Sequence, residues 1–179
     1  MKEEYKEMKE NLVDIIKEEQ AKLGYRKEII RLYYPLGSLN HLFKTNVDID
    51  GMKKILLDFC EDVSEFFGMI EISNNAERFC FKIPGEGAEY VHENISDNEF
   101  IYGLVKLVAD HSCTIDRIKQ YFLEFNHDIH YEKVSNGEFD YLLYFKDGIP
   151  DKYYYCFTID ECHVIYHRFL KHDYEDFEF

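Results

Sequence analysis

Every second position in residues 139–145 is large and apolar. These positions are Phe139, Tyr141, Leu143 and Phe145. Because the side chains of a strand point to its two faces in turn, the pattern predicts a strand with one buried face. The Asn136-Gly137 pair just before it suits a tight turn between antiparallel strands. Residues 129–134 are therefore expected to pair with this strand as a hairpin.

Two further segments extend this pattern towards the C-terminus. Residues 153–159 alternate in the same way, with the odd positions apolar. Residues 163–170 suit either a strand or the start of a helix, since their apolar positions fit both periods. Their β-branched and aromatic content favours the strand. Together, residues 128–170 are predicted to form a four-stranded antiparallel meander.

A helical period governs the first half of the chain. Apolar residues form one stripe along residues 2–23, and Gly24 is expected to stop that helix. A second helix is predicted after Asp48, with helical spacing kept to Gly68. Residues 25–43 are interrupted by Pro35 and Gly37, which leaves an extended or helical piece and then a helical turn beginning at Ser38.

The region between the first helices and the meander predicts a small β-pair and two more helices. Residues 69–72 and 78–83 read as two strands, followed by a plain loop at 84–87. Ser96 is the expected N-cap of the next helix, with Glu99 completing a capping box. A last helix is predicted over residues 115–125.

These elements predict an α+β fold. Helices pack on one face of the C-terminal antiparallel meander, and a small additional β-pair precedes it. The chain of 179 residues contains no repeat or linker, so residues 1–179 are expected to form one domain with an N-terminal amphipathic helix over residues 1–24.

Composition and charge restrict the function. The chain is 46% hydrophobic and 17% aromatic, with no apolar run long enough to span a membrane and no signal peptide at its charged start. A cytoplasmic protein with reduced cysteines is expected, since the five cysteines form no Cys-x-x-Cys pair. The net charge of −15 opposes binding to nucleic acid or to anionic membranes and favours a basic protein partner. The charge is equally consistent with a role in solubility alone.

The even positions of the meander predict a polar face rich in tyrosine. If the alternation holds in every strand, this face carries the candidate binding residues Tyr144, Tyr154, Tyr166 and Arg168. Tyrosine offers a large contact area together with a hydroxyl group, which suits a protein partner. The alternative interpretation is the solvated face of an ordinary antiparallel sheet.

A basic cluster stands out in the acidic N-terminal half. The cluster consists of Arg26, Lys27 and Arg31, next to Tyr25, Tyr33 and Tyr34. The arginine fork binds carboxylates and other anions through paired hydrogen bonds. These residues predict an anion or carboxylate site. The alternative is that they form ion pairs with the protein's own acidic side chains.

Cys162, His163 and His167 are the candidate metal ligands. On a helix, His163 and His167 would lie one turn apart and could hold a zinc ion, whereas on a strand they share a face but are too far apart. The alternative is two ordinary histidines. Cys113, near His111 at a predicted helix start, is a weaker candidate for a reactive thiolate, against a buried structural thiol.

Two apparent motifs fail on inspection. Residues 46–51 imitate the first half of a calcium-binding loop, but Leu57 replaces the glutamate required at its last position. The order of helices and hairpin after residue 99 resembles a winged helix, but the polar positions of the presumed recognition helix carry no net charge.

The segments IKEEQAKLGYRKEIIRLYYPLGSLNHLF and YYYCF…VIYHRF resemble a family of uncharacterised small bacterial proteins. The resemblance covers most of the chain and implies a single bacterial cytosolic domain. It transfers no catalytic or binding residue.

The sequence therefore favours a non-enzymatic binding or regulatory module that engages a basic protein through an acidic, tyrosine-rich surface and needs no cofactor. The alternative is a zinc-dependent enzyme that uses His163, His167 and a cysteine.

Overall fold

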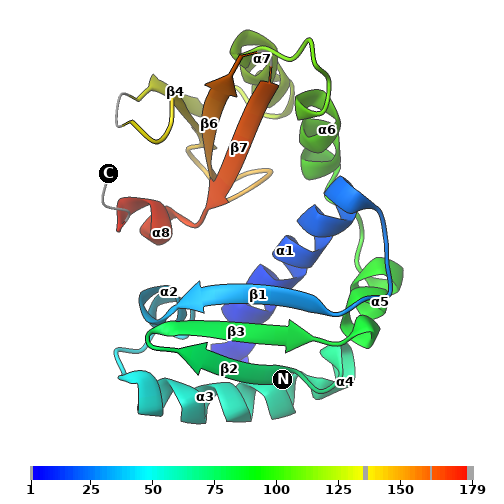
Figure 1. Ribbon diagram of the computed structural model, residues 1–179. Coiled ribbons are helices and arrows are strands. Elements are labelled where there is room, and N and C mark those ends of the chain that lie inside the picture. Colours follow the sequence, from blue (N-terminus) through cyan, green and yellow to red (C-terminus); the bar gives the residue numbers. More distant parts are fainter. Residues whose placement is uncertain (1, 135–136, 162, 177–179) are drawn as a thin grey trace. The chain divides into compact units, whose positions relative to one another are not determined.

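The computed structural model describes residues 2–134, 137–161 and 163–176. The chain divides into two compact units, Met1–Asp97 and Asn98–Phe179. The prediction of a single domain stays a prediction. The fold class is confirmed, because each unit combines helices with an antiparallel sheet and the C-terminal sheet is a four-stranded meander (Figure 1).

The N-terminal unit contains a three-stranded sheet and several helices. Its elements in order are η1 (Glu3–Tyr5), α1 (Lys6–Leu23), β1 (Ile30–Pro35), α2 (Leu36–Leu42), α3 (Ile49–Asp62), α4 (Ser64–Phe67), β2 (Glu71–Asn75), β3 (Arg78–Ile83) and α5 (Gly85–Asn94). The strand order is β1-β3-β2, so β3 is central. The predicted β-pair is thus confirmed, and β1 joins it as a third strand.

One face of this sheet is buried and the other is open. Along β1, Leu32 and Tyr34 are buried while Arg31 and Tyr33 are exposed, and β3 alternates in the same way. The inner face packs on α1, where the Tyr34 hydroxyl donates a hydrogen bond of 2.7 Å to Asn11 Oδ1. Helix α1 therefore packs on the sheet of its own unit.

Two helix ends in this unit follow the predicted local chemistry, and three predictions differ from the structure. The helix predicted up to Gly68 is divided, since α3 ends at Asp62 and α4 covers Ser64–Phe67. Gly24 ends α1 with a positive φ of 76°, and the Asp48 carboxylate caps α3 by accepting from the Gly51 N–H, both as predicted. Helix α2 begins at Leu36 rather than at Ser38. The predicted loop at residues 84–87 is instead the first turn of α5, which Pro84 can precede because its fixed φ is compatible with a helix start.

The C-terminal unit consists of the meander and the helices that cover it. Its elements are α6 (Glu99–Val108), α7 (Ile115–Phe125), β4 (Ile129–Lys133), β5 (Tyr141–Phe145), β6 (Tyr154–Asp160), β7 (His163–Phe169) and α8 (Lys171–Glu175). The strand order β4-β5-β6-β7 confirms the meander, including the strand prediction for residues 163–170. The N-cap of α6 is Asn98, not Ser96, because Asn98 Oδ1 accepts from the Ile101 N–H at 3.1 Å.

Helices α6 and α7 cover one face of the meander through aromatic rings. Phe100 of α6 packs against Phe145 at 5.1 Å between ring centroids, and Phe122 of α7 packs against Tyr155 at 5.5 Å. Edge-to-face pairs of this kind add about 0.5–1.5 kcal/mol each beyond the burial of their surface. Leu143 and Phe157 share this buried face, as the alternation predicted. The prediction is wrong for Phe139, which packs with Leu142 and Cys156, whose side chains lie on the other face. None of the helices in the described part of the chain combines the length and the apolar character that a membrane crossing requires.

Candidate functional site

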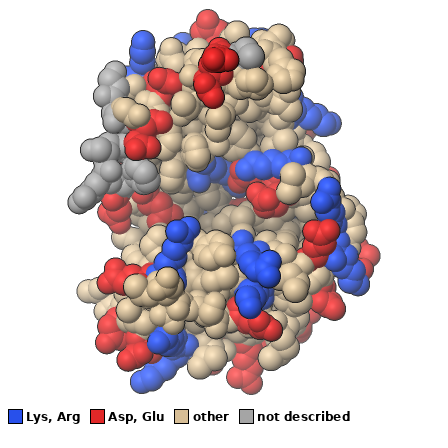
Figure 2. Space-filling view, viewed as in Figure 1, with Lys and Arg blue, Asp and Glu red and all other residues tan. Residues whose placement is uncertain are grey.

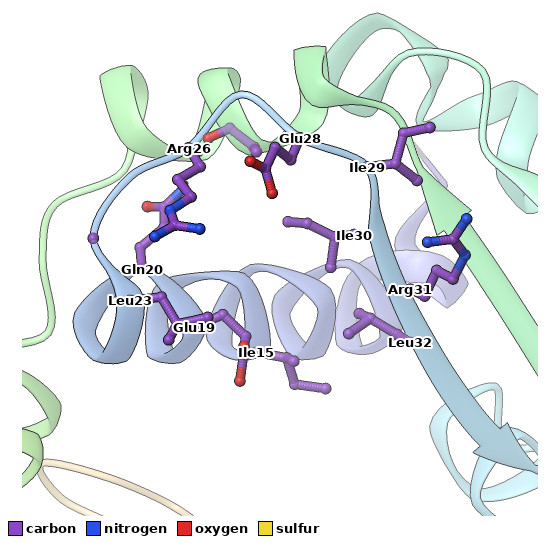
Figure 3. A pocket seen from close by; sticks show the side chains of 12 residues that line it. Ile15, Glu19, Gln20, Leu23, Arg26, Glu28, Ile29, Ile30, Arg31 and Leu32 are labelled. Atoms are coloured by element: carbon purple, nitrogen blue, oxygen red, sulfur yellow. Dashed lines mark hydrogen bonds between the residues drawn. The ribbon is translucent and has the colours of Figure 1, made fainter.

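A cavity of about 390 Å³ lies between α1 and the segment that leads into β1 (Figure 3). We call it the α1–β1 pocket. It is lined by Ile15, Glu19, Gln20, Leu23, Gly24, Arg26, Glu28, Ile29, Ile30, Arg31, Leu32 and Ala88. Its volume falls in the range of small-molecule sites. Two of the three residues of the basic cluster, Arg26 and Arg31, border it.

The segment at residues 24–29 is fastened to α5 by its odd-numbered side chains. The Tyr25 ring stacks on His92 at 4.2 Å with the planes 3° apart, and Lys27 Nζ forms an ion pair of 2.6 Å with Glu89. A Cβ on Gly85 would come within 3.2 Å of the Lys27 backbone, so the close approach requires glycine there. Because Tyr25 and Lys27 hold the outer side, the even-numbered side chains face the pocket.

Arg26 and Glu28 are those even-numbered side chains. Figure 3 shows both turned from the segment towards α1. With the residues that the structure describes, neither the Arg26 guanidinium nor the Glu28 carboxylate forms an ion pair or a hydrogen bond. Arg26 and Glu28 thus place opposite charges at one cavity without forming an ion pair with each other.

The guanidinium of Arg31 lies apart from them. It is on the other side of β1 from Ile30 and Leu32, as Figure 3 shows and the alternation of β1 requires. Arg31 has no ion pair in the described part of the chain either. Pairing with the protein's own acids is thus found for Lys27, which pairs with Glu89, and for neither Arg26 nor Arg31 among the described residues.

Gln20 contributes a buried amide to the pocket. Its side chain is 5% exposed, and its Nε2 donates a hydrogen bond of 2.9 Å to the Ala88 carbonyl oxygen. Its Oε1 is buried and accepts from no described residue. A buried acceptor without a donor costs about 1–3 kcal/mol, so a ligand N–H placed here would relieve that cost. Gln20 also belongs to the last turn of α1, where the helix dipole favours positive charge.

On the meander, two of the four predicted binding residues lie together. Tyr144 and Tyr154 stack at 3.9 Å with the ring planes 4° apart, and His130 stacks on Tyr144 at 4.7 Å. The Tyr154 ring also contacts Tyr174 of α8 at 5.6 Å. Both tyrosines are half-buried. Burial raises the pKa of Tyr154 to about 12, so its hydroxyl remains a hydrogen-bond donor at neutral pH.

The placement of Tyr166 and Arg168 beside those tyrosines is wrong. Arg168 pairs with Tyr155 across the sheet and Tyr166 pairs with Phe157, which puts both on the face that the helices cover. The Arg168 side chain is only 4% exposed and forms an ion pair of 2.7 Å with Asp151. Even-numbered residues of β7 do not lie on the same face as even-numbered residues of β5, because the turn before β7 sets the register of the last strand.

The predicted metal ligands are not brought together. His163 and His167 lie on β7, where a spacing of four residues separates them by about 13 Å. His163 Nε2 lies 3.1 Å from His111 Nδ1, and Cys162 lies outside the described residues. Within the described ranges, no group of three His, Cys, Asp or Glu side chains is placed to hold a metal ion.

Cys113, the candidate thiolate, is buried, and His111 contacts His163 instead. Burial raises the pKa of the Cys113 thiol, which disfavours the reactive form. The structural-thiol interpretation therefore fits the described surroundings of Cys113.

The family model described as "Domain of unknown function, E. rectale Gene description (DUF3877)" matches residues 5–178. The chain belongs to this family. Its membership agrees with the resemblance seen in the sequence and carries no activity. No curated protein and no solved structure matches the chain.

The sequence pattern predicted Arg26 as a binding residue, but it did not single out Glu28 and Gln20, which line the same pocket. An extended segment turns alternate side chains to opposite sides, so Arg26, Glu28 and Ile30 could have been grouped by the rule that identified the strands. No sequence signal brings Gln20 next to them, since that contact depends on how α1 packs against the segment.

Proposed function

We propose that this protein is a non-enzymatic binding module whose α1–β1 pocket takes a small zwitterion with an aliphatic side chain, such as a branched-chain amino acid. One observation carries the proposal. Arg26 and Glu28 face one cavity without pairing, beside the buried Gln20 oxygen that has no described donor.

The charges favour a ligand that bears both signs. The Arg26 guanidinium can bind a carboxylate through two hydrogen bonds. Glu28, Gln20 Oε1 and the C-terminal end of α1 can accept from an ammonium group. A plain anion would be repelled by Glu28 and the neighbouring Glu19, and a plain cation would be repelled by Arg26.

The rest of the lining supports an aliphatic group. Ile15, Leu23, Ile29, Ile30 and Leu32 border the cavity, and Leu23 and Ile29 are 64% and 57% exposed. A ligand that covers them removes apolar surface from water, worth about 25 cal/mol per Å². The described lining contains no serine, threonine, cysteine or histidine, which favours binding over covalent catalysis.

Calorimetry with leucine and two matched analogues tests the proposal. 4-Methylpentanoate lacks the ammonium group and 3-methylbutylamine lacks the carboxylate. Leucine is expected to bind and both analogues to bind at least about tenfold more weakly, because each leaves one pocket charge unmatched. At a hundredfold excess over Kd, leucine should stabilise the fold by about 2.7 kcal/mol.

Two substitutions locate the site. Arg26→Gln should weaken leucine more than 3-methylbutylamine, and Glu28→Gln should weaken leucine more than 4-methylpentanoate. Lys54→Gln and Glu61→Gln on α3 change the same charges outside the pocket and are expected to have no effect. Equal binding of all three compounds, or unchanged binding in both pocket variants, would refute the zwitterion site.

A second candidate, binding of a basic protein partner, is favoured by the stacked row of His130, Tyr144 and Tyr154. Half-buried aromatic rings in an acidic chain suit such a partner. Wild type and the double variant Tyr144→Ala/Tyr154→Ala have the same net charge. They should retain different sets of proteins from a lysate. Equal retention by both would attribute the binding to charge alone.

A further inference from the structure

The open face of the three-stranded sheet carries a basic groove in an otherwise acidic chain. A hollow of about 430 Å³ runs over this face. It is lined by Arg31, Tyr33, Ser73, Asn74, Asn75, Arg78, Cys80 and Lys82. Figure 2 shows basic side chains over this sheet on either side of an uncharged area. We call this surface the sheet groove. It is distinct from the α1–β1 pocket, because α1 packs on the opposite face of the sheet.

The strand register places like charges directly opposite each other at one end of the groove. Arg31 on β1 pairs with Lys82 on β3, and Lys82 pairs with Glu71 on β2. Like charges opposite each other on neighbouring strands are destabilising. Lys82 lies 3.4 Å from Glu71, but Arg31 has no ion pair with any described residue. A bound anion between Arg31 and Lys82 would remove this repulsion.

The other end of the groove carries a third cation. Arg78 lies over the Tyr33 ring at 5.1 Å from its centroid, and it is separated from Lys82 by four residues along β3. That spacing corresponds to about 13 Å. The middle row between the two ends consists of Tyr33, Cys80 and Ser73 and contains no Lys, Arg, Asp or Glu.

We propose that the sheet groove binds an extended acidic peptide segment of a partner protein, with carboxylates at positions i and i+4 and a small or apolar residue between them. Two such carboxylates lie about 13 Å apart on one face of an extended chain, which matches the distance between the two basic ends. The central residue then rests over Cys80 in the middle row. The Ser73 hydroxyl and the Asn74 and Asn75 amides line the β2 side and can bond the peptide backbone.

A single-stranded nucleic acid fits the groove less well. Arg78 already covers the Tyr33 ring, so the ring is not a free platform for stacking a base. The net charge of −15 repels a long phosphate backbone, whereas a short peptide with two carboxylates meets chiefly the local cations.

Fluorescence polarisation with labelled peptides tests the proposal. The probe is an alanine–serine peptide with aspartate at i and i+4, and the controls carry asparagine at both positions or aspartate at i and i+2. The i, i+4 peptide should bind best and lose affinity as salt is added. Arg31→Gln/Arg78→Gln should weaken it about tenfold, since each exposed charge contact is worth about threefold to fivefold. Lys53→Gln/Lys54→Gln, an equal loss of two positive charges on α3, should leave it unchanged.

Alkylation of Cys80 provides a second readout that does not depend on affinity differences. Cys80 is half-buried in the middle row, so the bound i, i+4 peptide should slow its reaction with iodoacetamide, followed by mass spectrometry of the Cys80 peptide. Both substituted arginines are exposed, and circular dichroism of the double variant should match wild type. Equal affinity for the i, i+2 and asparagine peptides, tighter binding of oligo-dT than of the acidic peptide, or unprotected Cys80 would each overturn the proposal.

Discussion

Asp151→Ala should destabilise the C-terminal unit strongly, because it removes the carboxylate that forms an ion pair with the buried Arg168 guanidinium. The two side chains are 2% and 4% exposed and their ion-pair distance is 2.7 Å. Arg168 also lies 3.7 Å from the centroid of the Tyr153 ring, which leaves it little room to turn towards water.

The structure sets the expected magnitude. Removing one partner of a buried ion pair costs about 3–5 kcal/mol. Asp151 Oδ1 also accepts from the Tyr153 N–H at 3.0 Å, and losing that acceptor adds about 1 kcal/mol. Asn98 Nδ2, 3.3 Å from Asp151, loses a weaker contact. We expect a total of about 4–6 kcal/mol, a large part of the stability of a typical domain.

Urea unfolding followed by far-ultraviolet circular dichroism measures this loss. Asp128→Ala breaks the exposed Lys146–Asp128 pair, whose side chains are 53% and 61% exposed, and should cost about 1 kcal/mol or less. Arg168→Met combined with Asp151→Ala removes both buried charges and should be more stable than Asp151→Ala alone. A cost for Asp151→Ala no greater than for Asp128→Ala would refute the reasoning.

Two further predictions concern packing and pH. Gly103→Ala in α6 should lower the free energy of unfolding by about 1–3 kcal/mol in a thermal melt, because its Cβ would meet the Tyr121 hydroxyl at 2.0 Å. Gly37→Ala in α2 places its Cβ in open space and should be neutral or stabilising. Similar losses of stability in both variants would contradict this. Burial raises the pKa of Tyr121 and Tyr154 from 10.0 to about 12, so the native state holds these protons more tightly than the unfolded chain. The free energy of unfolding should therefore be undiminished by these groups below pH 10 and fall as the pH rises towards 12. Tyrosinate absorbance that appears for all tyrosines near pH 10, with the fold intact, would argue against it.

Local patterns in the sequence determined most of the elements. The helical spacing after Asp48 and its capping carboxylate sufficed to place α3, and the two-residue period of residues 139–145 and 153–159 sufficed to place β5 and β6. The basic character of Arg26 and Arg31 was equally visible. These features depend on neighbours within one or two turns, so a linear pattern contains them.

Tertiary structure alone decided the features that depend on pairing between residues far apart in the sequence. Strand β1 forms because Leu32 pairs with Phe81 in β3. This contact joins residues about fifty positions apart, so no local hydrophobic pattern predicts it. The register of β7 moved Arg168 from the expected polar surface to a buried ion pair with Asp151. In the same way, the packing of α1 and α5 against residues 24–29 directs the Arg26 and Glu28 side chains towards the α1–β1 pocket. The Arg31 side chain lies in the sheet groove instead. Side chains acquire a shared site only when backbone pairing and helix packing set their direction, and the sequence order of residues does not encode that direction by itself.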